Sequence, residues 1–263
     1  MTKPKNELHH KYGSNIFIFD NPFYNGLLAE LCSEQTLQPR INRLVESLYR
    51  YLLSNCISDQ FATEKFKTKT RMWEIHPTVF LEGQRINPQQ KVISVNIARA
   101  GTYPSHICYD FLHDIIEPSC LRQDHIFASR AVNSKDQVTG TEISSTKIGG
   151  GKDDSIVLFP DPMGATGNTL IAAMKHYKQL VPGAHSKMIA LHLIVTPEYL
   201  KNLTQAHPDV IIYALRLDRG LSPEAALSAV PGTHWDLEKG LNPKDYIVPG
   251  GGGFGEIMNN SFV

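Results

Sequence analysis

The sequence SIVLFPDPMGATGNTL, residues 155–170, joins a short apolar run to a turn of small residues and then to a helix. The run 156–159 is apolar throughout, which is typical of a strand buried on both faces. Pro160 cannot donate to a sheet ladder, so we expect the strand to end there. Asp161 opens the turn, and an apolar helical pattern begins at Leu170. The stretch therefore predicts one strand–turn–helix unit of an α/β fold.

The turn between this strand and this helix has the chemistry of a site for a phosphate ester. Free amides at a helix start converge on an anion, and the helix dipole favours its charge. Thr166 and Thr169 add hydroxyl donors, and the small residues around them permit a close approach. Asp161, one loop earlier, can accept hydrogen bonds from sugar hydroxyls. The alternative is an ordinary strand–turn–helix junction, which is common in α/β proteins.

Residues 161–169 resemble the signature with which type I phosphoribosyltransferases bind 5-phosphoribosyl 1-pyrophosphate (PRPP), and the uracil phosphoribosyltransferase version most of all. That family usually has Leu where Gly164 stands, Gly at Asn168 and Ser at Thr169. The resemblance implies a Rossmann-like type I phosphoribosyltransferase fold: a central, mainly parallel sheet flanked by helices, with a flap and a C-terminal base-binding hood. It also implies that PRPP contacts Asp161, Pro162, Met163, Gly164, Ala165, Thr166, Gly167, Asn168 and Thr169.

Two arginines follow other predicted strands. Arg99 lies in a small-residue turn after the apolar run 92–97, and Arg130 ends the predicted strand 125–130. A guanidinium binds phosphate oxygens in pairs, although a surface arginine at a strand end is the alternative interpretation of Arg99. Residues 97–101 resemble the I-L-R-A-G loop of the same family, which holds the pyrophosphate of PRPP. The resemblance gives Arg130 the same role, with Ser129 in place of the family's Tyr.

Strands and helices alternate from residue 92 to residue 215, which predicts a mainly parallel sheet with right-handed crossovers. Ligands bind such sheets at the carboxyl ends of the strands. We expect Arg99, Arg130 and Asp161 to meet at this edge.

The segments outside this alternation carry weaker signals. We expect a helix capped by Thr36, with an apolar stripe that begins at Leu37, and later helices capped by Ser105 and Thr196. Residues 60–91 predict small strands or a flap, and the polar, Gly-rich residues 131–152 predict a mobile flap over the site.

Near the C-terminus, four consecutive glycines follow Pro249. The pattern G-x-G-x-x-G is formally present here, but only eight residues follow it, too few for a dinucleotide-binding unit. A glycine run lets main-chain groups press against a flat ligand such as uracil, whose edge presents one N–H donor between two carbonyl acceptors. Phe254 could pack on such a base. The alternative is a flexible tail.

The same C-terminal stretch resembles the uracil-binding tail of the family, Tyr-Ile-x-Pro-Gly-x-Gly-Asp-x-Gly-Asp. The resemblance gives main-chain base contacts to Ile247 and Gly252 and places Phe254 at the next contacting position. Gly253 stands where the family has an Asp that meets the sugar-pyrophosphate part of the ligand, and Glu256 replaces the last Asp. Gly253 therefore falls at both the PRPP and the uracil contact, without the family's carboxylate.

Length and composition predict one domain over residues 1–263, with a loose, polar N-terminal arm at 1–15. The family resemblance implies an insertion at about 219–239, before the base loop. Lys and Arg total 26, as do Asp and Glu, so the net charge calls for neither nucleic acid nor a membrane. Four scattered cysteines without a C-x-x-C pair, and the lack of an apolar leader, predict a cytoplasmic protein. His9 and His10 have no third ligand at a useful spacing, so we expect no protein-held metal.

The resemblance implies conversion of uracil and PRPP to UMP and pyrophosphate in pyrimidine salvage, with Mg²⁺ carried mainly by PRPP, and a homo-oligomer, a dimer or larger. Asp161, Arg99 and Arg130 would carry the reaction. The alternatives are a phosphoribosyltransferase-fold protein that senses nucleotides with weak or no turnover, and an enzyme for another base.

Overall fold

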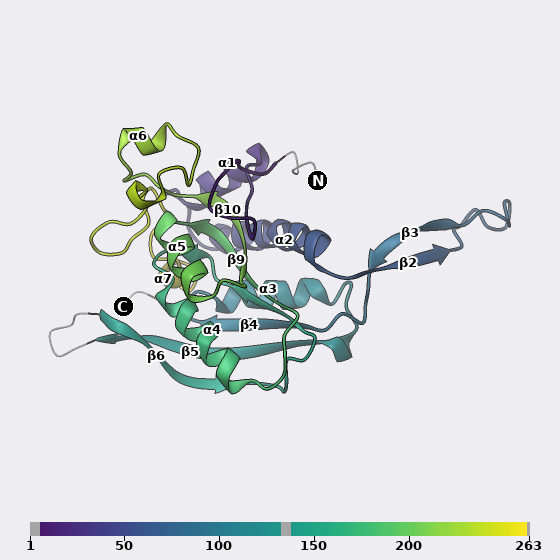
Figure 1. Ribbon diagram of the computed structural model, residues 1–263. Helices are drawn as coiled ribbons and strands as arrows, with labels where there is room; N and C mark the ends of the chain where they lie inside the picture. Colours follow the sequence, from purple (N-terminus) through teal and green to yellow (C-terminus); the bar gives the residue numbers. More distant parts are fainter. Residues whose placement is uncertain (1–5, 133–137, 262–263) are drawn as a thin grey trace.

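Eight strands form the central sheet, in the order β1-β10-β9-β7-β4-β5-β6, with the short β8 paired to β9 (Figure 1). Every pairing is parallel except β5 with β6, which confirms the predicted mainly parallel sheet. This computed structural model describes residues 6–132 and 138–261, without the side chains of 129–140. The strands are β1 (Ile16–Ile18), β4 (Val92–Ala98), β5 (Leu121–Val132), β6 (Val138–Lys147), β7 (Ile156–Pro160), β8 (Met163–Gly164), β9 (Lys187–Val195) and β10 (Ile211–Leu217).

Helices cover both faces of the sheet, which explains why the central strands β4, β7 and β9 are almost entirely buried. Side chains alternate along β7: Ile156 and Leu158 join one core cluster, and Val157 and Phe159 join the other. The first cluster lies under α1 (Pro22–Leu31), α2 (Arg40–Gln60) and α3 (Thr102–Leu112), and the second under α4 (Asn168–Leu180) and α5 (Pro197–Ala206). Helix α4 begins at Asn168, two residues before the apolar pattern from which we predict it.

Two predicted helix starts are wrong. Helix α2 begins at Arg40 without a side-chain cap, because the Thr36 hydroxyl instead donates to the carbonyl of Glu30, at 2.6 Å, in the turn after α1. Leu37 precedes the helix and is 71% exposed. Helix α3 begins at Thr102, and Ser105 is buried within it.

The N-terminal segment is not the loose arm that its polarity predicts, as far as the structure describes it from residue 6. His10 and Tyr12 are buried, and the amide of Leu8 donates to the carbonyl of Ile18 at 2.8 Å. The Tyr12 hydroxyl donates to the buried carboxylate of Glu238. The segment is ordered because it packs on a part of the chain more than 200 residues away, which local sequence cannot show.

Residues 219–239, predicted to be an insertion, form a small lobe with α6 (Glu224–Leu227) and the 3-10 turn η2 (Trp235–Leu237). Arg219 organises the lobe, since its guanidinium donates to the carbonyls of Ala226 and Ala229 and pairs with Glu238 at 3.2 Å. Another 3-10 turn, η1 (Pro118–Cys120), precedes β5, and the short helix α7 (Phe254–Ile257) lies near the C-terminus.

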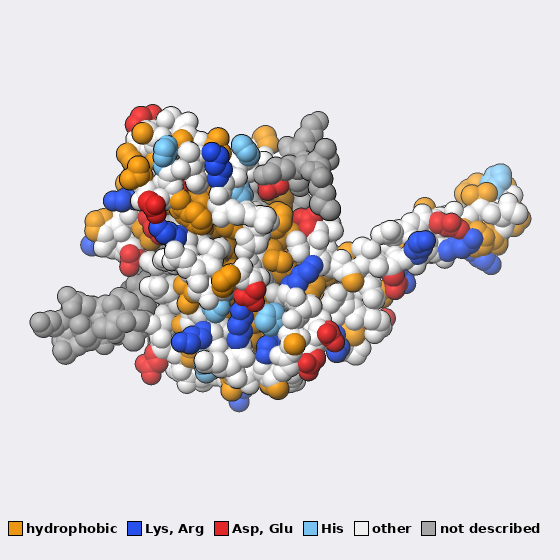
Figure 2. All heavy atoms as spheres, viewed as in Figure 1, with side chains coloured by type: hydrophobic (Ala, Val, Ile, Leu, Met, Phe, Trp, Pro, Cys, Tyr) orange, Lys and Arg blue, Asp and Glu red, His pale blue; other side chains and the backbone are white. Residues whose placement is uncertain are grey.

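The predicted small strands at 60–91 are confirmed as a hairpin of β2 (Thr63–Thr68) and β3 (Leu81–Ile86), separate from the main sheet. The hairpin projects from the body of the protein (Figures 1 and 2). Exposed apolar side chains, Met72, Ile75 and Val79, lie between the two strands in sequence.

The predicted flap at 131–152 is partly wrong. Residues 138–147 of it form β6, which pairs antiparallel with β5 and leads the chain back to the amino end of that strand. Residues 149–152 are fixed there, since the Gly149 amide donates to Asp124 at 2.9 Å and buried Lys152 donates to the carbonyl of Val181. The tip of the hairpin, 133–137, lies outside the described residues. Among the described helices, none combines the length and the apolar character needed to cross a membrane.

Candidate active site

The carboxyl ends of four parallel strands bring the candidate residues to one edge of the sheet. Arg99 follows β4, Asp161 follows β7, Thr196 follows β9 and Asp218 follows β10. The neighbouring β5 contains the backbone of Arg130, whose side chain lies outside what the structure describes. The predicted meeting of Arg99 and Asp161 at this edge therefore agrees with the topology.

Asp161 is held in an apolar setting at the end of β7. Its amide donates to the carbonyl of Leu191 on β9 at 3.0 Å. Burial raises the pKa of its carboxyl to about 6, and a hydrogen bond from the Met163 amide opposes the shift. A half-buried carboxylate of this kind can accept hydrogen bonds from hydroxyl donors when it is ionised.

In the turn after Asp161 the carbonyls accept hydrogen bonds from neighbouring residues, whereas several amides have no acceptor within the described residues. Thr196 donates to two of these carbonyls, from its amide to Gly164 at 3.0 Å and from its hydroxyl to Ala165 at 2.7 Å. The third carbonyl, of Thr166, accepts from the side chain of Asn202 on α5 at 2.9 Å. Within the described residues, the amides of Thr166, Gly167 and Thr169 have no hydrogen-bond acceptor. These free donors at the start of α4 are the chemistry that an anion needs.

The ring of Tyr199 lies against this turn and explains its glycines. A β-carbon on Gly164 would stand 2.9 Å from Cδ1 of Tyr199, closer than carbon atoms pack. Gly167 meets the same ring and has a φ of +85°, a left-handed conformation that favours glycine. The ring of Tyr199 thus occupies the volume into which the Leu expected at position 164 would project.

His192 holds the side chain of Tyr199 in place through a hydrogen bond to its hydroxyl. Its Nδ1 lies 2.5 Å from the carbonyl oxygen of Asp161, so Nδ1 carries the hydrogen and Nε2 accepts from the Tyr199 hydroxyl. Burial lowers the pKa of His192 to about 4, which keeps the ring neutral. His192, on β9, therefore connects the Asp161 backbone with the tyrosine that packs against the phosphate turn.

The C-terminal segment contacts the side chain of Arg99. Nη2 of Arg99 lies 3.1 Å from Oε1 of Glu256, and Nη1 donates to the carbonyl of Ser261 at 3.2 Å. Gly101 brings this turn close to β7, because a β-carbon there would stand 3.0 Å from the carbonyl oxygen of Pro160. The arginine turn and the phosphate turn are therefore neighbours.

A buried ion pair shapes the base loop, which we define as residues 247–254. Arg216 on β10 binds both carboxylate oxygens of Asp218, at 2.7 and 2.8 Å, and donates to the carbonyl of Gly250 at 3.0 Å. The Gly250 amide donates back to Asp218 at 2.8 Å. At the entry to the loop, Glu198 on α5 accepts from the amides of Gly240 and Leu241. The sheet edge and α5 together fix the path of this loop.

The predicted stacking of Phe254 on a base does not agree with its place in the fold. The ring is 4% exposed and packs in the core against Gly251, which leaves the main chain of residue 254 to meet a ligand. Ile247 is likewise buried, and Gly252 has a φ of +80°.

Sequence patterns do not reveal the residues that support these loops. Tyr199 and Asn202 belong to an ordinary amphipathic helix, and Arg216 to the end of a strand. Thr196 gives a signal, since it caps α5 as predicted by accepting from the Tyr199 amide at 3.0 Å. Its second bond, to Ala165, joins positions 31 residues apart.

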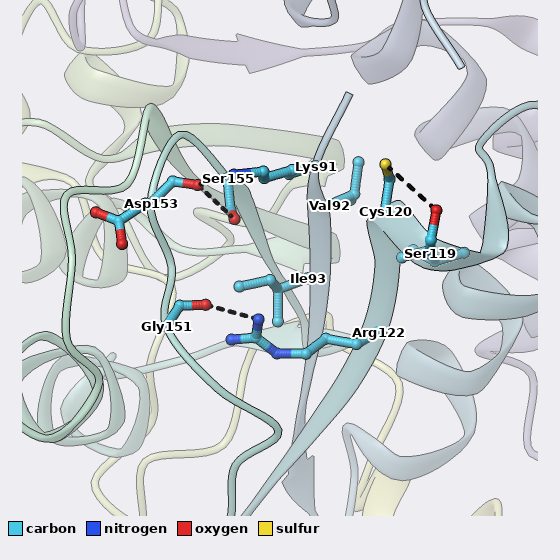
Figure 3. Close-up of a pocket in the computed structure, with 10 residues that line it drawn as sticks. Lys91, Val92, Ile93, Ser119, Cys120, Arg122, Gly151, Asp153 and Ser155 are labelled. Atoms are coloured by element: carbon cyan, nitrogen blue, oxygen red, sulfur yellow. Dashed lines mark hydrogen bonds between the residues drawn. The ribbon is translucent and has the colours of Figure 1, made fainter. Parts of the chain in front are cut away.

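A hollow of about 350 Å³ lies elsewhere, at the amino ends of β4 and β5 (Figure 3). Arg122 crosses it, but its guanidinium is committed to Asp124 and to the carbonyls of Gly150 and Gly151. This hollow is on the opposite edge of the sheet from Asp161 and has no part in the candidate site.

Taken with the parallel sheet, an amide-lined turn after a half-buried carboxylate and an arginine turn beside it define a phosphoribosyltransferase of type I. Enzymes of this class act on PRPP and a base. The chain belongs to the uracil phosphoribosyltransferase family, which matches residues 18–234.

The individual relatives are distant. The uracil phosphoribosyltransferase of Thermococcus kodakarensis is 26% identical over 237 residues, which cover 90% of this chain and 86% of the relative. The enzyme of that name from Agrobacterium fabrum is 39% identical over 106 residues, 40% of each chain. Among solved structures, the AQ2163 protein from Aquifex aeolicus superposes with a TM-score of 0.67 at 20% identity, over 92% of this chain and 97% of that one.

Proposed function

We propose that the protein transfers the phosphoribosyl group of PRPP to uracil, giving UMP and pyrophosphate, as a step of pyrimidine salvage. The choice of uracil as the base rests on the base loop. The family match ends at residue 234, so it does not cover this loop, and the loop has to be judged from its own geometry. Within the described residues, the amides of Gly251, Gly252 and Gly253 have no acceptor. Free main-chain donors of residues that have no side chains of their own suit the two carbonyl oxygens of uracil.

In the proposed reaction, the bond from C1 of the ribose to pyrophosphate breaks ahead of attack by the base nitrogen. Positive charge develops on the ribose, the electron pair of the broken bond leaves with the pyrophosphate, and the proton of the attacking uracil nitrogen passes to water or to the leaving pyrophosphate. The protein acts by placement and by complementary charge. The amides of Thr166, Gly167 and Thr169 hold the 5′-phosphate, Asp161 accepts from the ribose hydroxyls, and Arg99 and Arg130 stabilise the leaving pyrophosphate.

Mg²⁺ would enter with PRPP. Among the described residues there is no cluster of three or more His, Cys, Asp or Glu side chains able to hold a metal ion. The ligands would therefore be mainly phosphate oxygens and water, which Mg²⁺ prefers. The ion would offset charge on the leaving pyrophosphate. We also propose a homo-oligomer in the cytoplasm, with neither nucleic acid nor membrane as partner.

The test is to incubate the protein with PRPP, Mg²⁺ and each common nucleobase in turn and to detect the nucleotide formed. We expect UMP from uracil alone. Turnover of another base without turnover of uracil would overturn the substrate. Binding of PRPP or UMP by calorimetry, without turnover of any base, would favour the nucleotide-sensing alternative.

A further inference from the structure

The side chain of Glu256 folds back over Gly253. A β-carbon built on Gly253 would overlap Oε2 of Glu256, so the carboxylate fills the space in which a side chain at position 253 would begin. Gly253 precedes the first turn of α7, and Glu256 is the third residue of that helix. Residues three apart lie on the same face of a turn, so this approach follows from the backbone path.

The two oxygens of this carboxylate have different surroundings. Oε1 lies 3.1 Å from Nη2 of Arg99, and the two side chains are only 33% and 39% exposed. Oε2, over Gly253, has no hydrogen-bond partner within the described residues. One oxygen is therefore oriented by the guanidinium while the other is available beside the base loop.

We propose that Glu256 supplies the carboxylate that Gly253 lacks, and that its free oxygen accepts hydrogen bonds from the sugar-pyrophosphate part of the ligand. This inference rests on the proposed function, because the ligand is PRPP. Arg99 positions the carboxylate before the ligand enters and shares its charge with the pyrophosphate afterwards. The glutamate reaches from residue 256 because it is one methylene longer than aspartate.

Residues Gly253 and Glu256 compete for one volume, so their substitutions are not independent. Gly253→Asp alone places a second carboxylate against the first, with steric overlap and like-charge repulsion, and we expect no gain of activity. In the double variant, Glu256→Ala removes the glutamate side chain from this volume, and Gly253→Asp places a carboxylate there from residue 253.

The experiment measures steady-state kinetics with varied PRPP at saturating uracil, together with PRPP binding by calorimetry, for these variants. We expect Glu256→Ala and the isosteric Glu256→Gln to lower kcat/KM for PRPP by about 10- to 100-fold, the usual loss for a hydrogen bond to a charged group. We expect the KM for uracil to be nearly unchanged. The double variant should recover activity to within about fivefold of the wild type.

The matched control is Glu224→Ala, because Glu224 also lies in the first turn of a four-residue helix but away from the site. A glutamate that only stabilises α7 would lose activity in Glu256→Ala without recovery in the double variant, and that result would overturn the inference. So would a Glu256→Gln enzyme with wild-type kcat/KM, or a gain from Gly253→Asp alone; in either case the proposed function would stand. A wild-type protein that neither binds nor converts PRPP would overturn both.

Discussion

The contact between Gly164 and Tyr199 gives a sharp test of how the phosphate turn is built. Tyr199 is 1% exposed, and its hydroxyl is held by His192. The ring therefore has no free space into which to move. In Gly164→Ala the new methyl would lie 2.9 to 3.0 Å from three ring atoms, so either the turn or the ring must shift.

We expect Gly164→Ala to lower the free energy of unfolding by about 2 kcal/mol, within the range for overpacking a tight site. The backbone at Gly164 has no positive φ, so the cost comes from the contact alone. The matched control is Gly26→Ala in α1, where a β-carbon meets nothing within 4 Å. That change should raise stability by about 0.5 to 1 kcal/mol, since alanine favours helix over glycine.

The test measures the free energy of unfolding in urea for four proteins: the wild type, Gly164→Ala, Tyr199→Leu and the double variant. In the Tyr199→Leu background, which lacks the ring, we expect Gly164→Ala to lower the free energy of unfolding by less than about 0.5 kcal/mol. The difference from its effect in the wild type is a coupling typical of residues in contact. The turn should also move, raising the KM for PRPP in the single variant. An unchanged urea midpoint for Gly164→Ala, or an equal cost in the Tyr199→Leu background, would refute the reasoning.

Three further predictions concern the supports of the site. The pKa of Asp161 is raised to about 6 from an ordinary 3.8, so this group adds stability below about pH 4 that is lost as the pH rises through 6. The pKa of His192 is lowered to about 4 from 6.5, so this group adds stability above pH 6.5 that is lost as the pH falls through 4. Asp161→Asn should therefore make stability rise more steeply from pH 4 to pH 7 than in the wild type, by up to about 3 kcal/mol, and parallel urea curves for the two proteins would contradict this. Arg216→Leu leaves the buried Asp218 carboxylate without its guanidinium and should lower the free energy of unfolding by about 3 kcal/mol. It should also raise the KM for uracil more than the KM for PRPP, and equal changes in the two constants would count against a role of Arg216 in shaping the base loop. Thr196→Val removes the cap of α5 and the bond to Ala165, and should lower the free energy of unfolding by about 1 to 2 kcal/mol, a loss that wild-type thermal stability would exclude.

The parts of the fold that follow from sequence are those with a strong local pattern. Strand β7, the turn after it and α4 are correctly predicted because burial on both faces leaves an apolar run, and because the helix begins directly after the small residues. The rule that ligands meet parallel strands at their carboxyl ends then places Arg99 and Asp161 correctly. Short β1 was missed, since three residues are too few to show a period.

The errors arise where distant contacts decide the structure. The Gly-rich residues 149–152 have the composition of a lid, but the antiparallel course of β6 carries them to the far edge, where Asp124 fixes them. Phe254 is aromatic beside a predicted base site, yet the core beneath Gly251 takes its ring. Composition describes what a segment can do, whereas its position depends on partners that the local pattern does not contain.

Both departures from the family that lose a side chain, Gly164 and Gly253, have the same physical explanation. At each, a larger residue from a neighbouring helix fills the missing volume: the ring of Tyr199 over Gly164, and the carboxylate of Glu256 over Gly253. A glycine is required at each position because the space is already taken. The absence of a family side chain at such a position therefore does not by itself indicate lost function. Substituting either glycine alone tests its steric overlap with Tyr199 or Glu256, not the contact of a side chain with the ligand. Only paired substitutions separate the two.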